Sequence, residues 1–172
     1  MCIRDRYLAG EFGGPADLDP GPAIDERLGQ GSLGDVFVLK LNAAGNHVWA
    51  RDAIGPGIDK PFGIAVDASG NSYVTGEFSE QVSGLGTNGQ GLSLFDGANG
   101  FVFGLDSAGE QTFVFSFGND LPDRGRAVAL DGSGNAYVTG EFSRVAEFDP
   151  VSGFSRLFSN GGTDMFVARF TN

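Results

Sequence analysis

Apolar residues are gathered in short runs along the chain, and each run is about four to seven residues long. The runs are rich in Val, Phe, Ile and Tyr, and polar segments with Gly, Asn, Asp or Pro separate them. Runs of this length and composition are typical of β-strands and are too short for helices. The pattern predicts ten strands and almost no helix, with strand centres near residues 9, 38, 49, 65, 75, 103, 114, 128, 139 and 167.

The strands belong to an internal repeat. A motif with a shared Tyr, Gly, Glu and Phe occupies residues 7–12, 73–78 and 137–142, at steps of 66 and 64 residues. A second motif occurs three times in the same phase, and two further motifs occur twice each. Four motifs in constant order indicate a repeat architecture, whose strands we name a, b, c and d in chain order.

The connections within each repeat differ in length. Four short ones carry Asp or Asn first and Gly fourth, at residues 42–46, 67–71, 106–110 and 131–135. In a type I turn the leading oxygen accepts a hydrogen bond from a turn amide, and Gly adopts a positive φ at little cost. Such turns close antiparallel hairpins, so a is predicted to pair with b, and c with d. The b–c connections are long, and in a meander they share the opposite end of the sheet with the d–a crossings.

Repeated four-stranded antiparallel sheets are the blades of a β-propeller, and they stack because one sheet cannot bury both its faces alone. The predicted fold is all-β: a β-propeller fragment of about two and a half four-stranded antiparallel blades. A parallel β-helix or a β-sandwich is the alternative. Parallel pairing between the strands of Tyr73 and Tyr137 would favour the β-helix.

The repeat predicts how the chain is divided. Residues 7–54 are expected to form a partial blade with strands b, c and d, residues 55–118 a complete blade, and residues 119–172 a partial blade with a, b and c. Because closed propellers have at least about four blades, we expect a fragment. Residues 1–6 share nothing with the repeats and resemble the translated adapter sequence of metagenomic reading frames, so they are expected to be a non-native leader.

Two of the runs, at residues 63–76 and 35–42, resemble the SBBP-type bacterial β-propeller repeat. The segment 16–22, echoed at 146–150, looks like the b–c loop of the same family. The resemblance extends from Tyr7 to the end of the chain. It implies the propeller fold and a place in a large secreted or surface-attached bacterial protein, and therefore an extracellular or cell-surface location.

The net charge of −11 restricts the partners. It repels nucleic acid and anionic membranes, and no apolar run is long enough to span a bilayer. Cys2 is the single cysteine, so no disulfide forms within the chain. We expect a protein or glycan ligand and further blades of the same chain as partners, with no nucleic acid and no membrane insertion.

The sequence offers no nucleophile with a neighbouring base. His47 is the only histidine and is predicted to be an exposed strand residue, and Cys2 lies in the expected leader. No zinc-binding cluster and no phosphate-binding loop are present either. We therefore expect no catalytic or cofactor-binding residues and a non-catalytic segment for binding, adhesion or scaffolding. The alternative is a fragment of a propeller-fold carbohydrate-active enzyme whose catalytic residues lie outside this chain.

Carboxylates in matching b–c connections are the candidate metal ligands. Asp17 and Asp19 correspond to Glu147 and Asp149, and alternating carboxylates in such loops supply the hard oxygen ligands that calcium prefers. The alternative is that they cap solvated turns before Pro. We place any ligand at the end of the sheets that carries the long connections, together with Asp59.

Three further glutamates, Glu11, Glu77 and Glu141, occupy one position in the three b strands. A repeated position favours a structural role, in which each carboxylate accepts backbone N–H groups where the strand enters its loop. The alternative is a ring of carboxylates that binds a ligand.

Overall fold

The computed structural model describes residues 4–30, 34–80, 82–84, 98–118, 122–148 and 156–170, where every regular element is a strand. Among these residues no helix is present that is long and apolar enough to cross a membrane. All ten strand centres predicted from the sequence fall within strands, and the all-β fold is confirmed.

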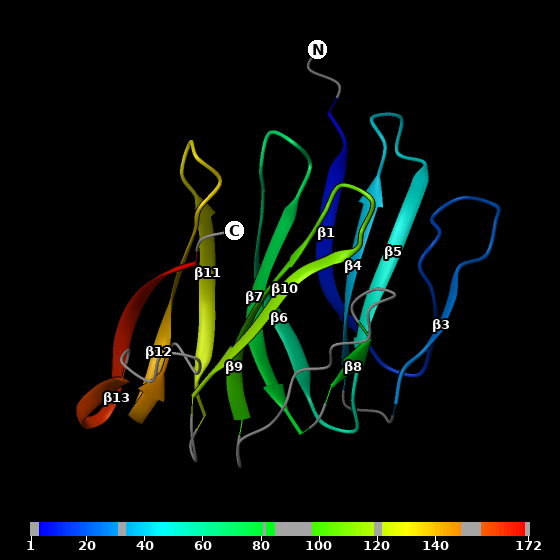
Figure 1. Ribbon diagram of the computed structural model, residues 1–172. Coiled ribbons are helices and arrows are strands. Elements are labelled where there is room, and N and C mark those ends of the chain that lie inside the picture. Colours follow the sequence, from blue (N-terminus) through cyan, green and yellow to red (C-terminus); the bar gives the residue numbers. More distant parts are fainter. Residues whose placement is uncertain are drawn as a thin grey trace.

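The middle sheet is the complete four-stranded unit that the repeat predicted (Figure 1). Strands a, b, c and d are β6 (Asp59–Val66), β7 (Ser72–Ser79), β9 (Ala98–Leu105) and β10 (Gln111–Phe117). They follow one another across the sheet, and each neighbouring pair is antiparallel. Tyr73 and Tyr137 belong to different sheets, which excludes the parallel pairing expected of a β-helix.

The two outer sheets carry three repeat strands each. Strands b, c and d of the first sheet are β1 (Arg6–Phe12), β4 (Asp35–Leu41) and β5 (His47–Ile54). Strands a, b and c of the third sheet are β11 (Arg124–Leu130), β12 (Ala136–Glu147) and β13 (Arg156–Phe170). Shorter strands come from the b–c connections: β8 (Ser83–Gly84) pairs with β5, and β2 (Pro15–Asp17) pairs with β3 (Glu26–Leu28).

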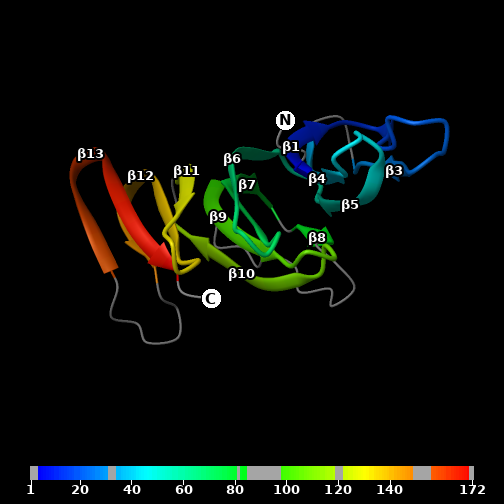
Figure 2. The ribbon, with the colours of Figure 1, turned by 90° about the horizontal axis from the view of Figure 1, so that it is seen from above.

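The three sheets stand in a row with their faces turned toward one another (Figure 2). The a strands β6 and β11 come close together, since a Cβ on Gly63 would lie 3.2 Å from the Cα of Ala127. One core cluster joins the first sheet to the second, and its members include Val36, Val38, Phe101 and Phe103. Another joins the second sheet to the third, and its members include Val102, Phe117, Val138 and Phe166. The middle sheet therefore buries both faces, as a propeller blade does.

The four short turns have the predicted construction. In the β6–β7 turn, Asp67 Oδ1 accepts the N–H groups of Ser69 and Asn71 at 2.8 and 2.9 Å, and Gly70 has a φ of +85°. The other three turns repeat these bonds, with leading residues Asn42, Asp106 and Asp131. Each turn thus fixes the register of its hairpin through one side-chain oxygen and one glycine.

The structure departs from the expectation in the connections. The first b–c connection is folded as the β2–β3 hairpin, whose Ala16 and Leu18 pack against Leu39 and Ala50 on the outer face of the first sheet. Strand β1 begins at Arg6, which belongs to the segment expected to be a leader. These elements depend on contacts with distant parts of the chain, which local sequence patterns do not display.

Candidate functional site

Asp17 and Asp19, two of the predicted metal ligands, cap turns of the β2–β3 hairpin. Asp17 Oδ1 accepts the backbone N–H groups of Asp19 and Asp25 at 3.0 and 2.9 Å. Asp19 Oδ1 accepts the N–H of Gly21 at 2.7 Å. The bond from Asp25 is the main reason that the pKa of Asp17 is lowered. This is the turn-capping arrangement that the sequence analysis gave as the alternative to calcium binding.

The position of Asp19 differs from the predicted one. It lines a cavity of about 290 Å³ together with Pro20 and with Gly45, Asn46 and His47 of the short β4–β5 turn. The hairpin therefore folds back along the first sheet, and its tip reaches the end that carries the tight turns. The prediction that Asp19 lies at the long-connection end is wrong, because the apolar contacts of Leu18 draw the hairpin over the sheet.

Glu147 and Asp149 are the remaining predicted ligands. Glu147 ends β12 and forms an ion pair with Arg156, its partner across the β12–β13 pair. Asp149 lies outside the described residues. The β2–β3 hairpin and β13 lie at opposite ends of the row of sheets (Figures 1 and 2), so Asp17 and Glu147 do not share one site. Within the described ranges, no three His, Cys, Asp or Glu side chains are grouped to hold a metal ion.

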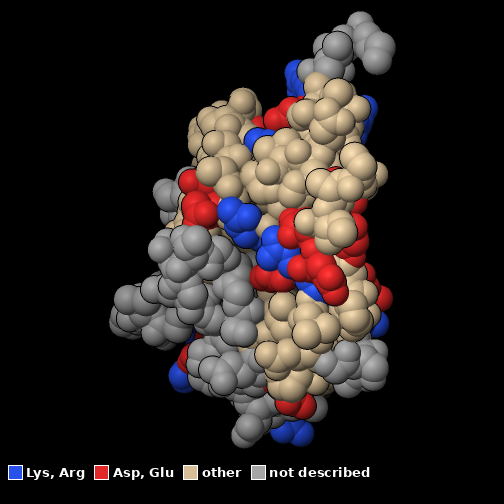
Figure 3. All heavy atoms as spheres, turned by 90° about the vertical axis from the view of Figure 1, so that its right-hand side faces the viewer, with Lys and Arg blue, Asp and Glu red and all other residues tan. Residues whose placement is uncertain are grey.

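His47 is less exposed than the sequence predicted. Its Nε2 lies 3.1 Å from Asp25 Oδ2, and Asp25 also forms an ion pair with Arg27 at 2.9 Å. Arg27 reaches Asp52 of β5 at 3.7 Å, which ties the hairpin to the sheet. Charged atoms of both signs gather across this face of the molecule (Figure 3). The arrangement holds the hairpin in place through alternating charges.

Two of the three repeated glutamates join neighbouring sheets. Arg124, the first residue of β11, forms ion pairs with Glu77 of the middle sheet and with Glu141 of its own sheet. Arg126 also pairs with Glu141. Burial opposes ionisation of Glu141, but the two guanidinium groups outweigh it and lower its pKa. The predicted backbone N–H partners are thus wrong for Glu77 and Glu141, whose partners are arginines of β11.

Sequence reasoning missed a set of buried aspartates at the strand starts. Asp35 is buried at the start of β4, where its Oδ1 accepts the N–H of Gly55 at 2.8 Å and its Oδ2 that of Gln30 at 2.9 Å. Asp59 and Asp123 are buried as well, although Asp59 had been expected beside a ligand site at the long-connection end of the sheets. Their recurrence at a step of 64 residues is the signal that could have marked them as structural.

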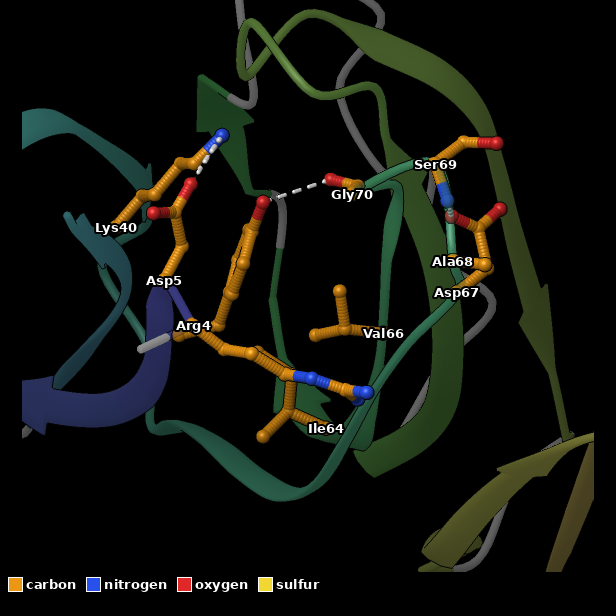
Figure 4. Close-up of a pocket in the computed structure, with 10 residues that line it drawn as sticks. Arg4, Asp5, Lys40, Ile64, Val66, Asp67, Ala68, Ser69 and Gly70 are labelled. Carbon is orange, nitrogen blue, oxygen red and sulfur yellow. Dashed lines mark hydrogen bonds and ion pairs between the residues drawn. The ribbon is translucent and has the colours of Figure 1, made fainter. Parts of the chain in front are cut away.

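A cavity of about 660 Å³ lies between β1 and the β6–β7 hairpin (Figure 4). Tyr7 donates a hydrogen bond to the Gly70 carbonyl at 3.0 Å, and Lys40 faces Asp5 at 3.5 Å. Lys40 also donates to the Ser107 carbonyl at 3.0 Å and lies over the Tyr7 ring. The side-chain contact with Tyr7 is the main cause that raises the pKa of Lys40. The polar groups of this cavity are thus engaged in contacts between the first two sheets.

Stacked four-stranded antiparallel sheets with repeated turns define this molecule as a β-propeller segment. Comparison with family models agrees: residues 48–77 match the SBBP model, described as a beta-propeller repeat. The match runs from β5 through β6 into β7, and so crosses from the first sheet to the second. The match supports an SBBP-type repeat in this part of the chain. No curated protein matches it.

Proposed function

We propose that this propeller segment is a non-catalytic scaffold that serves binding or adhesion through a protein or glycan ligand. It would belong to a secreted or cell-surface bacterial protein. The observation that carries the proposal is the diversity of the b–c connections on otherwise repeated sheets. The first forms the β2–β3 hairpin, the second sends β8 to the edge of the first sheet, and the third lengthens β12 and β13. Variable connections on a rigid sheet are where binding residues concentrate.

The charged residues that recur in each repeat also support a role as a scaffold. The turn aspartates hold hairpins, and Arg124 links the second and third sheets through Glu77 and Glu141. Their repetition is therefore explained by structure. The unrepeated features, such as the exposed Ile24 of the β2–β3 hairpin, are the ones free to meet a ligand.

The net charge indicates which ligands fit. At −11 the chain attracts cationic partners and admits neutral glycans, whereas it repels nucleic acid and anionic membranes. The location in a secreted or surface protein rests on the resemblance to the SBBP-type repeat.

Binding of the chain to immobilised neutral, cationic and acidic polysaccharides tests the proposal, with new reducing ends measured in parallel. We expect binding to neutral or cationic polymers, no release of reducing ends, and a weaker signal for Ile24→Ser. Ala43→Ser in the short β4–β5 turn is the control and should leave binding unchanged. Binding to none of the polymers would remove the support for a glycan ligand, and new reducing ends would overturn the non-catalytic role.

A further inference from the structure

Strand β13 contains a bulge where it pairs with β12. The register of the pair shifts at Arg144, so that this one residue of β12 faces residues 159–162 of β13. Arg144 has a φ of +57°, and its N–H donates to Ser159 Oγ at 2.7 Å. A bulge of this kind leaves the extra residues outside the ladder of the sheet. Residues 159–162 thus have no register partner on the neighbouring strand.

The bulge contains an Asn-Gly dipeptide, Asn160 and Gly161, that faces solvent. Asn160 is exposed, and its backbone N–H donates to Asp164 Oδ2 at 2.7 Å. Within the described residues, its side-chain amide has no hydrogen-bond partner. Gly161 has a φ of +122°, and no atom of the described residues lies within 4 Å of the place where its Cβ would be. In this part of the chain, neither a ladder pair nor a packed side chain holds the peptide bond between the two residues.

An asparagine followed by glycine can lose its side-chain amide without an enzyme. The glycine nitrogen gives up its proton to solvent and forms a bond to Cγ of the asparagine, and the bond from Cγ to the side-chain nitrogen breaks, so that ammonia leaves. Water then opens the resulting five-membered imide at one of its two carbonyls, which gives aspartate or isoaspartate. The net reaction consumes one water, releases one ammonia and leaves one carboxylate. Glycine favours the ring closure because it has no Cβ and adopts the required backbone conformations easily.

The same dipeptide occurs at Asn99 and Gly100 of β9, where its surroundings are the opposite. Asn99 is 1% exposed, and Gly100 pairs with Glu77 of β7 on one side and with Phe117 of β10 on the other. A Cβ on Gly100 would lie 2.2 Å from the Phe117 ring. Ring closure at this site requires the sheet to open on both sides of β9, so folding protects Asn99.

We propose that Asn160 is a site of spontaneous deamidation in the folded chain, and that it is converted there to aspartate and isoaspartate while Asn99 is not. The new carboxylate adds a negative charge close to Asp164, whose Oδ2 accepts the Asn160 N–H. Isoaspartate also lengthens the main chain by one carbon. The bulge accommodates this change, because residues 159–162 have no ladder pairs to lose. The modification is independent of the ligand proposed for the b–c connections.

Peptide mapping of the full chain by mass spectrometry tests the proposal. The folded chain is incubated in mildly alkaline buffer, which favours the deprotonated glycine nitrogen, and samples are digested with chymotrypsin over time. Cleavage after Phe158 and Phe95 separates the peptides of Asn160 and Asn99 from each other and from the Asn-Gly at 88–89, which lies outside the described residues. A sample taken at time zero corrects for losses during digestion. A parallel incubation in concentrated guanidinium chloride measures both sites in the unfolded chain.

In the folded chain we expect Asn160 to deamidate faster than Asn99 by more than about tenfold, since a paired and packed segment reacts only on opening. In guanidinium chloride the two rates should become similar. Gly161→Ala should slow the reaction at Asn160, because its methyl group hinders ring closure. Gly162→Ala is the matched control and should leave the rate unchanged, since its Cβ meets no atom of the described residues within 4 Å.

Equal rates at Asn160 and Asn99 in the folded chain would overturn the proposal. A difference that persists in guanidinium chloride would do the same, because it would arise from the local sequence and not from the fold. So would a rate at Asn160 that folding lowers by more than about tenfold, which would show that the bulge is protected.

Discussion

Asp59 and Asp123 occupy the same position in successive repeats, but their carboxylates have different surroundings. Asp123 Oδ1 accepts the N–H of Ser143 at 2.7 Å. The equivalent N–H, that of Ser79, is directed to the Ile58 carbonyl at 3.0 Å, and among the described residues neither oxygen of Asp59 has a hydrogen-bond partner. Burial raises the pKa of Asp59 to about 7; the nearby Ser79 N–H opposes the rise, and Asp35 and Glu80 add to it. One backbone bond thus decides whether this repeated aspartate is stabilising.

The raised pKa of Asp59 predicts that stability falls as pH rises from about 4 to about 7. In this window the folded chain holds a proton that the unfolded chain has lost, so unfolding releases it and becomes easier at higher pH. Asp59→Asn replaces the ionisable carboxyl group by a neutral amide. It should therefore raise the free energy of unfolding at pH 8, by roughly 1.4 kcal/mol for each unit of pKa shift. Urea unfolding at pH 5 and pH 8 checks this.

Asp123→Asn is the matched control, because it removes a carboxylate that accepts a backbone N–H. We expect it to destabilise the chain at pH 8 rather than stabilise it. A wild-type stability that is the same at pH 5 and pH 8, with no gain from Asp59→Asn, would contradict the account of Asp59.

At the scale of elements, the sequence predicts the hairpins well and the long connections poorly. The short turns are local: an Asp or Asn oxygen and a glycine three residues later hold each of them, so the sequence of each turn predicts it. The β2–β3 hairpin depends instead on Leu18 meeting Ala50, and on Arg27 meeting Asp52. Such contacts join residues far apart in the chain, and no local pattern shows them.

Of the four predicted calcium ligands, only Asp17 and Asp19 lie together, and both are in the β2–β3 hairpin. Their Oδ1 atoms accept backbone N–H groups, which leaves the Oδ2 atoms for a cation. If calcium binds, calorimetric titration at millimolar-order calcium should give a heat and a rise in melting temperature that Asp17→Asn with Asp19→Asn abolishes. Absence of both in the wild-type chain would leave these residues as turn caps only.

At the scale of the molecule, the internal repeat predicts stacked sheets, and the structure contains them. What the repeat does not reveal is which equivalent residues become buried, because burial depends on the neighbour that each sheet meets. Val102 and Val167 share one position and differ in exposure for this reason. Likewise the pairing of Arg124 with Glu77 links two sheets, and the sequence alone predicted a different partner for that glutamate.

The central claim is that the sheets pack as successive blades through a glycine on the inner strand, and a double-mutant cycle tests it directly. Gly125→Ala should lower the free energy of unfolding by about 1–3 kcal/mol, because its Cβ would overlap Thr75 Oγ1. In a Thr75→Ala background most of that cost should vanish, which gives a coupling energy above about 0.5 kcal/mol. Gly132→Ala, whose Cβ has no atom of the described residues within 4 Å, is the control and should change stability by less than about 0.5 kcal/mol. Equal cost of Gly125→Ala in both backgrounds would contradict the packing of β11 on β7.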